Sequence, residues 1–186
     1  MPGLSDQRQG DNMQVSTMPP QESGPAAKTD NRVGKYLAFH LGREEFAIQV
    51  LKVREIMGIQ DITAVPQTPV YVKGVINLRG KVIPVVDLRL KFGLPEIEYT
   101  QRTCIIVVQI QAPGGGVSLT GIVVDEVSEA VNVAAGEIAD TPDFGDGVAT
   151  PYILGMAKSK GKVKILLDID QVLSSQDLDG LKALMQ

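Results

Sequence analysis

The sequence predicts a mainly β protein built from two similar small barrels, and three observations support this. Short runs of apolar and β-branched residues are separated by turns that contain Gly and Pro, a pattern typical of strands. One hairpin pattern occurs twice along the chain, which indicates two similar units. No stretch between the strands offers the crossover helix of about ten or more residues that a parallel α/β sheet needs.

The best-defined element is a hairpin formed by residues 74–78 and 81–87. Its two strands are separated by Arg79 and Gly80, and the glycine supplies the positive φ that a tight reversal requires. Pro84 lies inside the second run and cannot donate a hydrogen bond to a neighbouring strand. The hairpin is therefore expected at an edge or a bulge rather than in the middle of a sheet.

The same hairpin pattern returns 81 positions later in the chain. The repeated residues are Gly74, Gly80, Lys81, Val82 and Asp87, which correspond to Gly155, Gly161, Lys162, Val163 and Asp168. A second set returns 74 positions later, with Ile48, Val53 and Glu55 corresponding to Ile122, Val127 and Glu129. Because the offset grows from 74 to 81, seven residues are inserted in the second copy, and the loop-like segment 137–151 is their expected place.

The repeat predicts a first barrel over about residues 35–92 and a second over about residues 102–173. It leaves open whether the strands of the two barrels interleave. Strand order along the chain alone does not decide which strands share a sheet, so both arrangements are retained.

The first predicted strand covers residues 35–41. Leu37, Phe39 and Leu41 alternate with their neighbours, as in a strand with one buried face. A return strand is predicted to begin at Phe46.

The apolar period changes after this return strand. Val50, Val53, Ile56 and Met57 fall at helical spacing, which predicts a short helix packed on the sheet. Residues 59–65 again have the composition of a strand.

The next elements repeat this order of strands and short helices. Residues 88–92 are predicted to form one helical turn, and residues 104–110 and 117–124 two further strands. Asp87 and Asp168 occupy equivalent repeat positions ahead of apolar turns, where aspartate commonly caps a helix. Both are therefore expected to be structural.

The two ends of the chain differ from the rest in composition. Residues 1–32 are dominated by polar residues, Gly and Pro, which predicts a disordered tail. Residues 176–186 are predicted to form a C-terminal helix, since Ser174 and Asp177 resemble a capping box. One face of that helix would carry Leu178, Leu181 and Met185.

Composition excludes several classes of protein. The net charge of −4 and the pI near 5.0 argue against a nucleic-acid binder. The single cysteine, Cys104, has no partner for an internal disulfide, and no segment approaches the roughly 18 apolar residues of a membrane helix. A cytoplasmic protein is expected.

No motif nominates an enzyme. The sequence has one histidine, His40, no Cys/His pair, no Gly-x-Ser-x-Gly and no phosphate-binding loop. A metal site is not expected either, because His40 has no second His or Cys as a co-ligand. No cofactor is predicted, and a binding module is favoured over a catalyst.

Three segments carry a family resemblance: residues 48–55, the run Pro69-Val-Tyr-Val-Lys-Gly-Val-Ile-Asn-Leu-Arg-Gly-Lys-Val-Ile-Pro-Val-Val-Asp-Leu-Arg89, and residues 121–127. Together they resemble the CheW family, the coupling proteins of bacterial chemotaxis. The resemblance extends over about residues 35–175, and the domain is placed at 33–175. It implies two five-stranded SH3-like barrels in tandem and no catalytic activity.

The resemblance also implies partners. A member of this family links the histidine kinase CheA, through the regulatory domain of CheA, to the cytoplasmic tips of methyl-accepting chemoreceptors in a membrane-associated array. Other CheW-like domains are further expected partners. Membrane insertion and nucleic-acid binding are not expected.

The resemblance assigns roles to individual residues. Arg79, Val53, Glu55 and Val127 match receptor-contacting positions, while Gly74, Asn77, Gly80 and Asp87 belong to the structural motif of the hairpin. The resemblance also places the kinase surface on the first barrel, where exposed apolar residues near Met57 and Ile59 are expected to form it. Structural alternatives remain open: Arg79 as a solvated turn residue, Val53 and Val127 as core, and Glu55 as half of a surface ion pair.

Two other functions remain as alternatives. The chain could be the regulatory CheW-like fragment of a larger kinase or of a CheV-type protein, although no kinase or receiver segment is present in it. It could also be an unrelated small β-barrel module that binds peptides or nucleic acid. The 4% aromatic content argues against nucleic acid, because it leaves few platforms for base stacking.

Overall fold

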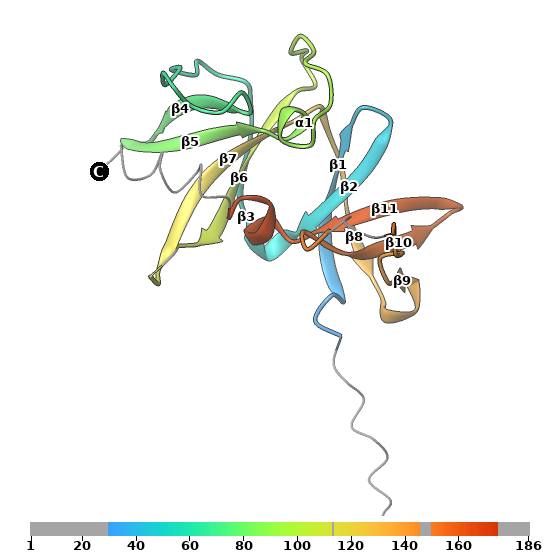
Figure 1. Ribbon diagram of the computed structural model, residues 1–186. Coiled ribbons are helices and arrows are strands. Elements are labelled where there is room, and N and C mark those ends of the chain that lie inside the picture. Colours follow the sequence, from blue (N-terminus) through green and yellow to red (C-terminus); the bar gives the residue numbers. More distant parts are fainter. Residues whose placement is uncertain (1–29, 113, 146–149, 175–186) are drawn as a thin grey trace, which may run out of the picture.

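The computed structural model describes residues 30–112, 114–145 and 150–174, and its strands form two sheets (Figure 1). The mainly β prediction is confirmed. The segments 1–29 and 175–186, to which most of the predicted tail and the predicted C-terminal helix belong, lie outside the described residues. In the described part of the chain, no helix has both the length and the apolar character needed to cross a membrane.

Each sheet curls into a small barrel. Barrel 1 contains, in spatial order, β3 (Val53–Gly58), β6 (Cys104–Gln111), β7 (Val117–Val124), β5 (Lys81–Asp87) and β4 (Val72–Leu78). Barrel 2 contains β8 (Glu126–Val133), β1 (Gly34–Leu41), β2 (Glu44–Gln49), β11 (Lys162–Leu167), β10 (Ile153–Ser159) and β9 (Ile138–Ala139). The chain after β3 returns to β4 through a bridge between Thr63 and Val75, and β9 returns to β10 in the same way.

The strands of the two barrels interleave along the chain. Barrel 1 takes β3, β4 and β5 from the first half and β6 and β7 from the second, while barrel 2 takes the remaining strands. The predicted boundaries at 35–92 and 102–173 therefore do not separate the sheets. Barrel 2 also has one more strand than expected, because the two residues of β9 pair with β10.

Strand register supports the internal repeat. Val53 lies opposite Val108 in barrel 1, and its repeat partner Val127 lies opposite Phe39 in barrel 2. Both hairpins turn through two residues with positive φ, at 51° and 84° for Arg79 and Gly80. The second hairpin turns at Lys160 and Gly161, with φ of 51° and 74°. These values are those of a type I′ turn, whose twist matches that of the strands it joins.

Pro84 was expected at an edge or a bulge, but β5 lies between β4 and β7. Its missing N–H is tolerated because the pairing with β7 begins only at Val85. The edge strand of this hairpin is β4, whose ladder contains a register shift next to Gly74.

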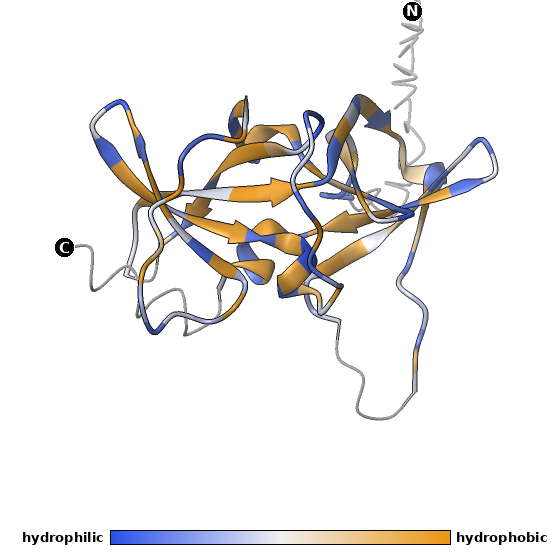
Figure 2. Ribbon diagram, turned by 90° about the horizontal axis from the view of Figure 1, so that it is seen from above, coloured by the Kyte–Doolittle hydropathy of each residue, from blue (hydrophilic) through white to orange (hydrophobic). Residues whose placement is uncertain are grey.

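Three apolar clusters form the core. A central cluster lies between the barrels, and each barrel has its own interior cluster. The predicted one-sided burial of β1 is wrong, because Tyr36 and Ala38 on its other face are also fully buried. One face of β1 supplies Leu37 and Phe39 to the central cluster, and the other packs inside barrel 2. Hydrophobic colour accordingly follows the strands, whereas hydrophilic colour marks the hairpin tips (Figure 2).

The helix predicted over residues 50–57 is wrong. A single 3-10 turn, η1 (Val50–Lys52), is followed directly by β3. The helical spacing arose because Val50 and Val53 both pack against the central cluster from different elements, while Ile56 is 45% exposed. The strand predicted at 59–65 is reduced to the single bridge at Thr63.

The two predicted aspartate caps are confirmed. Asp87 precedes the short helix α1 (Leu88–Lys91) and accepts hydrogen bonds from the backbone N–H groups of Arg89 and Leu90. Asp168 precedes α2 (Ile169–Val172) and does the same for the second and third residues that follow it. Each helical turn thus begins where a hairpin ends, which satisfies backbone donors that would otherwise lack partners.

Two ion pairs of opposite polarity tie the helical turns to the segments that cross between the barrels. Arg89 of α1 pairs with Asp125 at 2.7 Å, and the same carboxylate accepts a hydrogen bond from Gly42 N–H at 2.6 Å. Asp170 of α2 pairs with Lys52 at 2.6 Å and accepts from Gln111 N–H at 2.8 Å. The acid lies on the crossing segment in one case and on the helical turn in the other.

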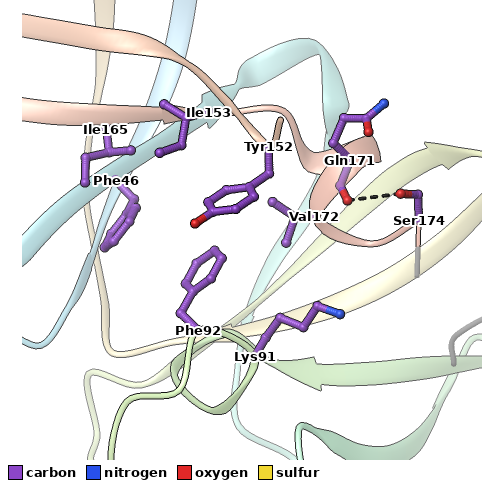
Figure 3. A pocket seen from close by; sticks show the side chains of 9 residues that line it. All are labelled: Phe46, Lys91, Phe92, Tyr152, Ile153, Ile165, Gln171, Val172 and Ser174. Carbon is purple, nitrogen blue, oxygen red and sulfur yellow. Dashed lines mark hydrogen bonds between the residues drawn. The ribbon is translucent and has the colours of Figure 1, made fainter. Parts of the chain in front are cut away.

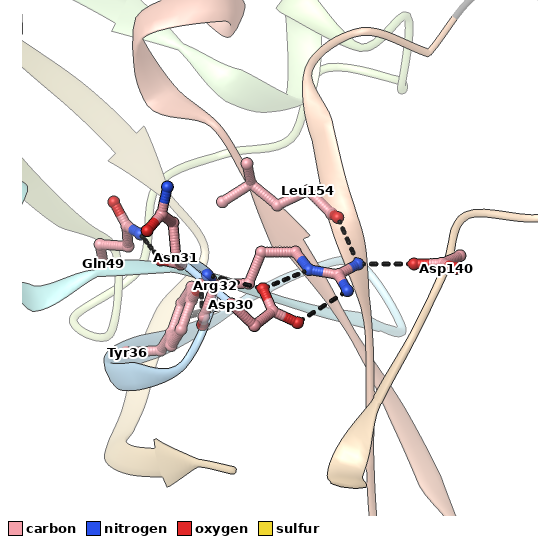
Figure 4. Close-up of polar contacts among 7 residues, drawn as sticks. All are labelled: Asp30, Asn31, Arg32, Tyr36, Gln49, Asp140 and Leu154. Carbon is pink, nitrogen blue, oxygen red and sulfur yellow. Dashed lines mark hydrogen bonds and ion pairs between the residues drawn. The ribbon is translucent and has the colours of Figure 1, made fainter. Parts of the chain in front are cut away.

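Residues 30–32, assigned to the tail by the sequence, are ordered (Figure 4). The Arg32 guanidinium donates to Asp30, to Asp140 beyond β9 and to the Leu154 carbonyl of β10. The hydrogen bond from Arg32 lowers the pKa of the Asp30 carboxyl. Arg32 therefore fastens the segment before β1 to the opposite side of barrel 2.

Replacing Gly74 by alanine is expected to destabilise the protein by more than about 1 kcal/mol. A Cβ at this position would lie 2.0 Å from the Thr63 carbonyl oxygen, and the φ of +141° already disfavours a side chain. Urea unfolding followed by circular dichroism measures the loss. Gly80→Asn serves as the control, because no atom lies within 4 Å of its Cβ and asparagine tolerates positive φ. Equal losses for the two variants would contradict the close-approach argument.

A double-mutant cycle on Arg89 and Asp125 is expected to show strong coupling. Their side chains are only 12% and 20% exposed, so removing either partner should cost about 2 kcal/mol or more, and the double variant should lose less than the sum. The free energy of unfolding in urea gives the four values. The exposed pair Arg102 and Glu126, 3.6 Å apart, is the control and should couple by less than about 1 kcal/mol. Additive losses at Arg89 and Asp125 would refute the coupling.

Candidate interaction surfaces

The first candidate surface is at the tip of the β4–β5 hairpin. Two hydrogen bonds of 2.9 and 3.0 Å join the Arg79 guanidinium to the Glu55 carboxylate on β3. A hydrogen bond within the turn stabilises it, because Asn77 Oδ1 accepts from Gly80 N–H at 2.8 Å. Arg79 remains 75% exposed and Glu55 30% exposed, so the pair presents a planar charged group to solvent.

This geometry brings together two of the four residues predicted to contact a receptor. Both residues stay accessible to solvent. Glu55 can therefore be half of a surface ion pair and a contact residue at the same time. An exposed pair of this kind contributes little to stability, about 1 kcal/mol at most. Its bidentate geometry holds the Arg79 guanidinium in one orientation.

The other two residues, Val53 and Val127, are half-buried at equivalent positions of the repeat. Each begins or nearly begins the strand that follows a crossing between the barrels, and each packs against the central cluster. Val53 shares β3 with Glu55, whereas Val127 belongs to β8 of the other barrel. Both valines therefore contribute to the core, as one of the alternatives held. Each also keeps part of its surface exposed.

Met57 and Ile59, predicted to lie near an exposed apolar kinase surface, are half-buried instead. Both pack against the interior cluster of barrel 1, and Met57 Sδ accepts a hydrogen bond from the Gln60 amide at 3.0 Å. The alternation of β3 points Ile56 the other way, into solvent. The exposed apolar residue of this strand is thus one position away from the predicted one.

An aromatic pocket at the junction of the barrels had no counterpart in the sequence-based predictions (Figure 3). It has a volume of about 550 Å³ and lies between α1, α2 and β2. Phe39, Phe46, Phe92 and Tyr152 stack in series, with ring centroids 5.7 to 6.1 Å apart. Phe46, Phe92 and Tyr152 line the pocket and come from three separate segments, so no local pattern in the sequence groups them. Phe39 lies opposite Phe46 in the β1–β2 hairpin and extends the stack beyond the lining.

Titratable groups form no catalytic or metal-binding constellation in the residues that the structure describes. No group of three or more His, Cys, Asp and Glu side chains is placed to hold a metal ion there. His40 Nδ1 lies 3.1 Å from the Ser128 hydroxyl on β8. The Tyr99 hydroxyl donates to the buried Asp87 at 3.1 Å, and burial is the main cause that raises the pKa of this tyrosine.

Comparisons with known proteins agree with this architecture. A family model described as the CheW-like domain matches residues 35–177. The chemotaxis protein CheW of Klebsiella aerogenes is 39% identical over 144 residues, which cover 77% of this chain and 84% of that protein. The chemotaxis protein CheW of Rhizobium meliloti is 36% identical over 156 residues, which cover 83% and 97% of the two chains.

A solved structure shares the fold. The crystal structure of the scaffolding protein TtCheW from Thermoanaerobacter tengcongensis superposes with a TM-score of 0.68 at 29% sequence identity. The match covers 78% of this chain and 95% of that chain, and it confirms the predicted pair of SH3-like barrels. The family match also excludes an unrelated peptide-binding barrel. On the family model, the two relatives and the shared fold together, the chain belongs to the CheW family.

Proposed function

We propose that this chain is a non-catalytic adaptor that couples chemoreceptors to the histidine kinase CheA in a chemosensory array. The names of its relatives support a role in chemotaxis, and that of TtCheW supports a scaffold. The observation that carries the proposal is the oriented pair of Arg79 and Glu55, which occupies the positions that the family motif assigns to receptor binding. In this proposal the chain works in the cytoplasm and is recruited to membrane-associated receptors.

The proposed receptor surface contains Arg79, Glu55, Val53 and Val127. A receptor tip is a helical hairpin, so its apolar face would contact the exposed parts of the two valines. Its polar groups would hydrogen-bond with the guanidinium that Glu55 holds in place. Because both valines pack on the central cluster, a change at this surface reaches both barrels.

The proposed kinase surface lies on barrel 1, around the exposed parts of Met57 and Ile59. The regulatory domain of CheA would bind there. A receptor-linked shift at one surface then changes the free energy of binding at the other, which is the requirement for coupling. The link is supported by β3, because this one strand carries both Glu55 of the receptor surface and Met57 of the kinase surface.

Arg79→Glu is expected to weaken binding to a receptor tip by about tenfold or more while leaving CheA binding unchanged, because it places two carboxylates together at the tip. Pull-down or calorimetry against each partner separately measures this. Lys160→Glu, at the equivalent tip of barrel 2, is the matched control. The swap Arg79→Glu with Glu55→Arg restores the ion pair but should not restore receptor binding. Equal loss of both partners would overturn the assignment of Arg79 to one surface.

Ile59→Ser is expected to weaken binding to the CheA regulatory domain while receptor binding persists, because it removes apolar contact area. Ile59 also packs on the barrel interior, so the urea midpoint of each variant is compared first. Ile56→Ser tests the outer face of β3, the strand that ends one residue before Ile59. A loss of CheA binding in Ile56→Ser with none in Ile59→Ser would move the kinase surface to the outer face of β3.

A further inference from the structure

The open end of barrel 2 contains a polar pocket of about 630 Å³. One wall is formed by β8 together with the turn η2 (Ala135–Glu137), and the other by the β10–β11 hairpin. Glu129 and Glu137 lie on the first wall, and Lys160 and Lys162 on the second. The two walls therefore carry opposite charges.

The repeat explains why this end is open. At three positions a bulky apolar residue of barrel 1 is replaced by a smaller or polar one in barrel 2, 81 positions later. The equivalent pairs are Ile76 and Ala157, Leu78 and Ser159, and Ile83 and Lys164. Since a folded interior is otherwise close-packed, these replacements leave space where barrel 1 is filled.

The deepest charged group of the pocket is already neutralised. The side chain of Lys164 is only 9% exposed and forms an ion pair of 3.4 Å with Glu45, which is 15% exposed. Strand register places the two residues directly opposite each other on β11 and β2. His40 lies opposite Glu45 on the next strand, and its ring contacts the Ser128 hydroxyl. These lining groups have partners, so the free charges are those of the two walls.

The two walls contain the counterparts of the receptor-surface pair. Lys160 is the repeat partner of Arg79, and Glu129 is the repeat partner of Glu55. In barrel 1 the arginine reaches across to the glutamate and forms a bidentate pair. Among the residues that the structure describes, Lys160 and Glu129 form no ion pair and instead line the pocket between them. Lys162 and Glu137 also lack an ionic partner within that part of the chain.

We propose that this pocket binds a small zwitterion, such as an amino acid, whose carboxylate meets Lys160 and Lys162 and whose ammonium group meets Glu129. Three lysines and three glutamates line the pocket, so its formal charge is balanced when His40 is neutral. A ligand with a net charge gains no overall attraction there, whereas a dipolar ligand aligned between the walls gains at both ends. In barrel 2 the bound zwitterion would bridge the two charged positions that Arg79 and Glu55 join directly in barrel 1.

A series of amino acids with increasing charge separation tests the proposal: glycine, β-alanine, γ-aminobutyrate and 6-aminohexanoate. Amide chemical shifts of the full chain report binding at residues 128–133 and 157–164. One spacing is expected to bind tightest, because the distance between the walls is fixed. Acetate and methylammonium are the controls, because they carry the same two charges on separate molecules. Alone or mixed, they should shift these amides much less.

Four variants locate the site. Lys160→Ala and Glu129→Ala should each weaken the tightest ligand by about tenfold or more, since each removes one charged contact. Ser159→Leu, which introduces the residue that barrel 1 has at Leu78, should block binding by filling the pocket. Lys81→Ala, the barrel 1 counterpart of a change at Lys162, should have no effect.

The double swap Lys160→Glu with Glu129→Lys keeps the total charge but leaves one lysine and one glutamate on each wall, because Lys162 and Glu137 are unchanged. It should therefore weaken binding of the tightest ligand. Thermal unfolding confirms that each variant is folded, and receptor and CheA binding are measured in parallel because the proposed site does not depend on either. Shifts of similar size with acetate alone would show an anion site and overturn the proposal. So would the absence of shifts at both walls, or equal binding by Lys160→Ala and the unaltered chain.

Discussion

The interleaving of strands through the central cluster is the constraint on which the rest of the structure depends. The chain crosses from barrel 2 to barrel 1 after β2 and returns after β7, and both crossings pack on the same apolar cluster. The helical turns that end the two hairpins hold these crossings through Arg89 and Asp170. The barrels are consequently two ends of one body rather than two linked modules, and a surface on either end is rigidly placed relative to the other.

Within this frame the two barrels have diverged most at their open ends. The hairpin, its type I′ turn and its capping aspartate are the same in both, because these features determine whether the barrel forms. The side chains at the ends are free of that requirement. Barrel 1 is filled with β-branched residues and closed by Arg79 and Glu55, while barrel 2 has alanines and a buried lysine.

Features with a local cause could be predicted from the sequence. The central hairpin, its repeat and the caps at Asp87 and Asp168 each depend on a few neighbouring residues. Predictions failed where contacts with distant segments determine the local structure or the burial of a strand. The spacing of Val50 and Val53 suggested a helix because both contact one cluster, and the two-sided burial of β1 follows from its place between two cores. The aromatic pocket joins rings from three segments. The pairing of Arg79 with Glu55 depends on the fold, which sets β3 beside the hairpin tip.

The order of the strands has a consequence for synthesis of the chain on the ribosome. Barrel 1 is complete only when β7, which ends at Val124, has emerged, and barrel 2 waits for β11, which ends at Leu167. β1 and β2 are made first, yet β2 pairs in parallel with β11, more than a hundred residues later. Nascent chains therefore expose unpaired strands through most of translation, and closure of such distant pairs is slow. Barrel 1 can therefore close as soon as β7 has emerged, whereas barrel 2 stays open until β11 is made.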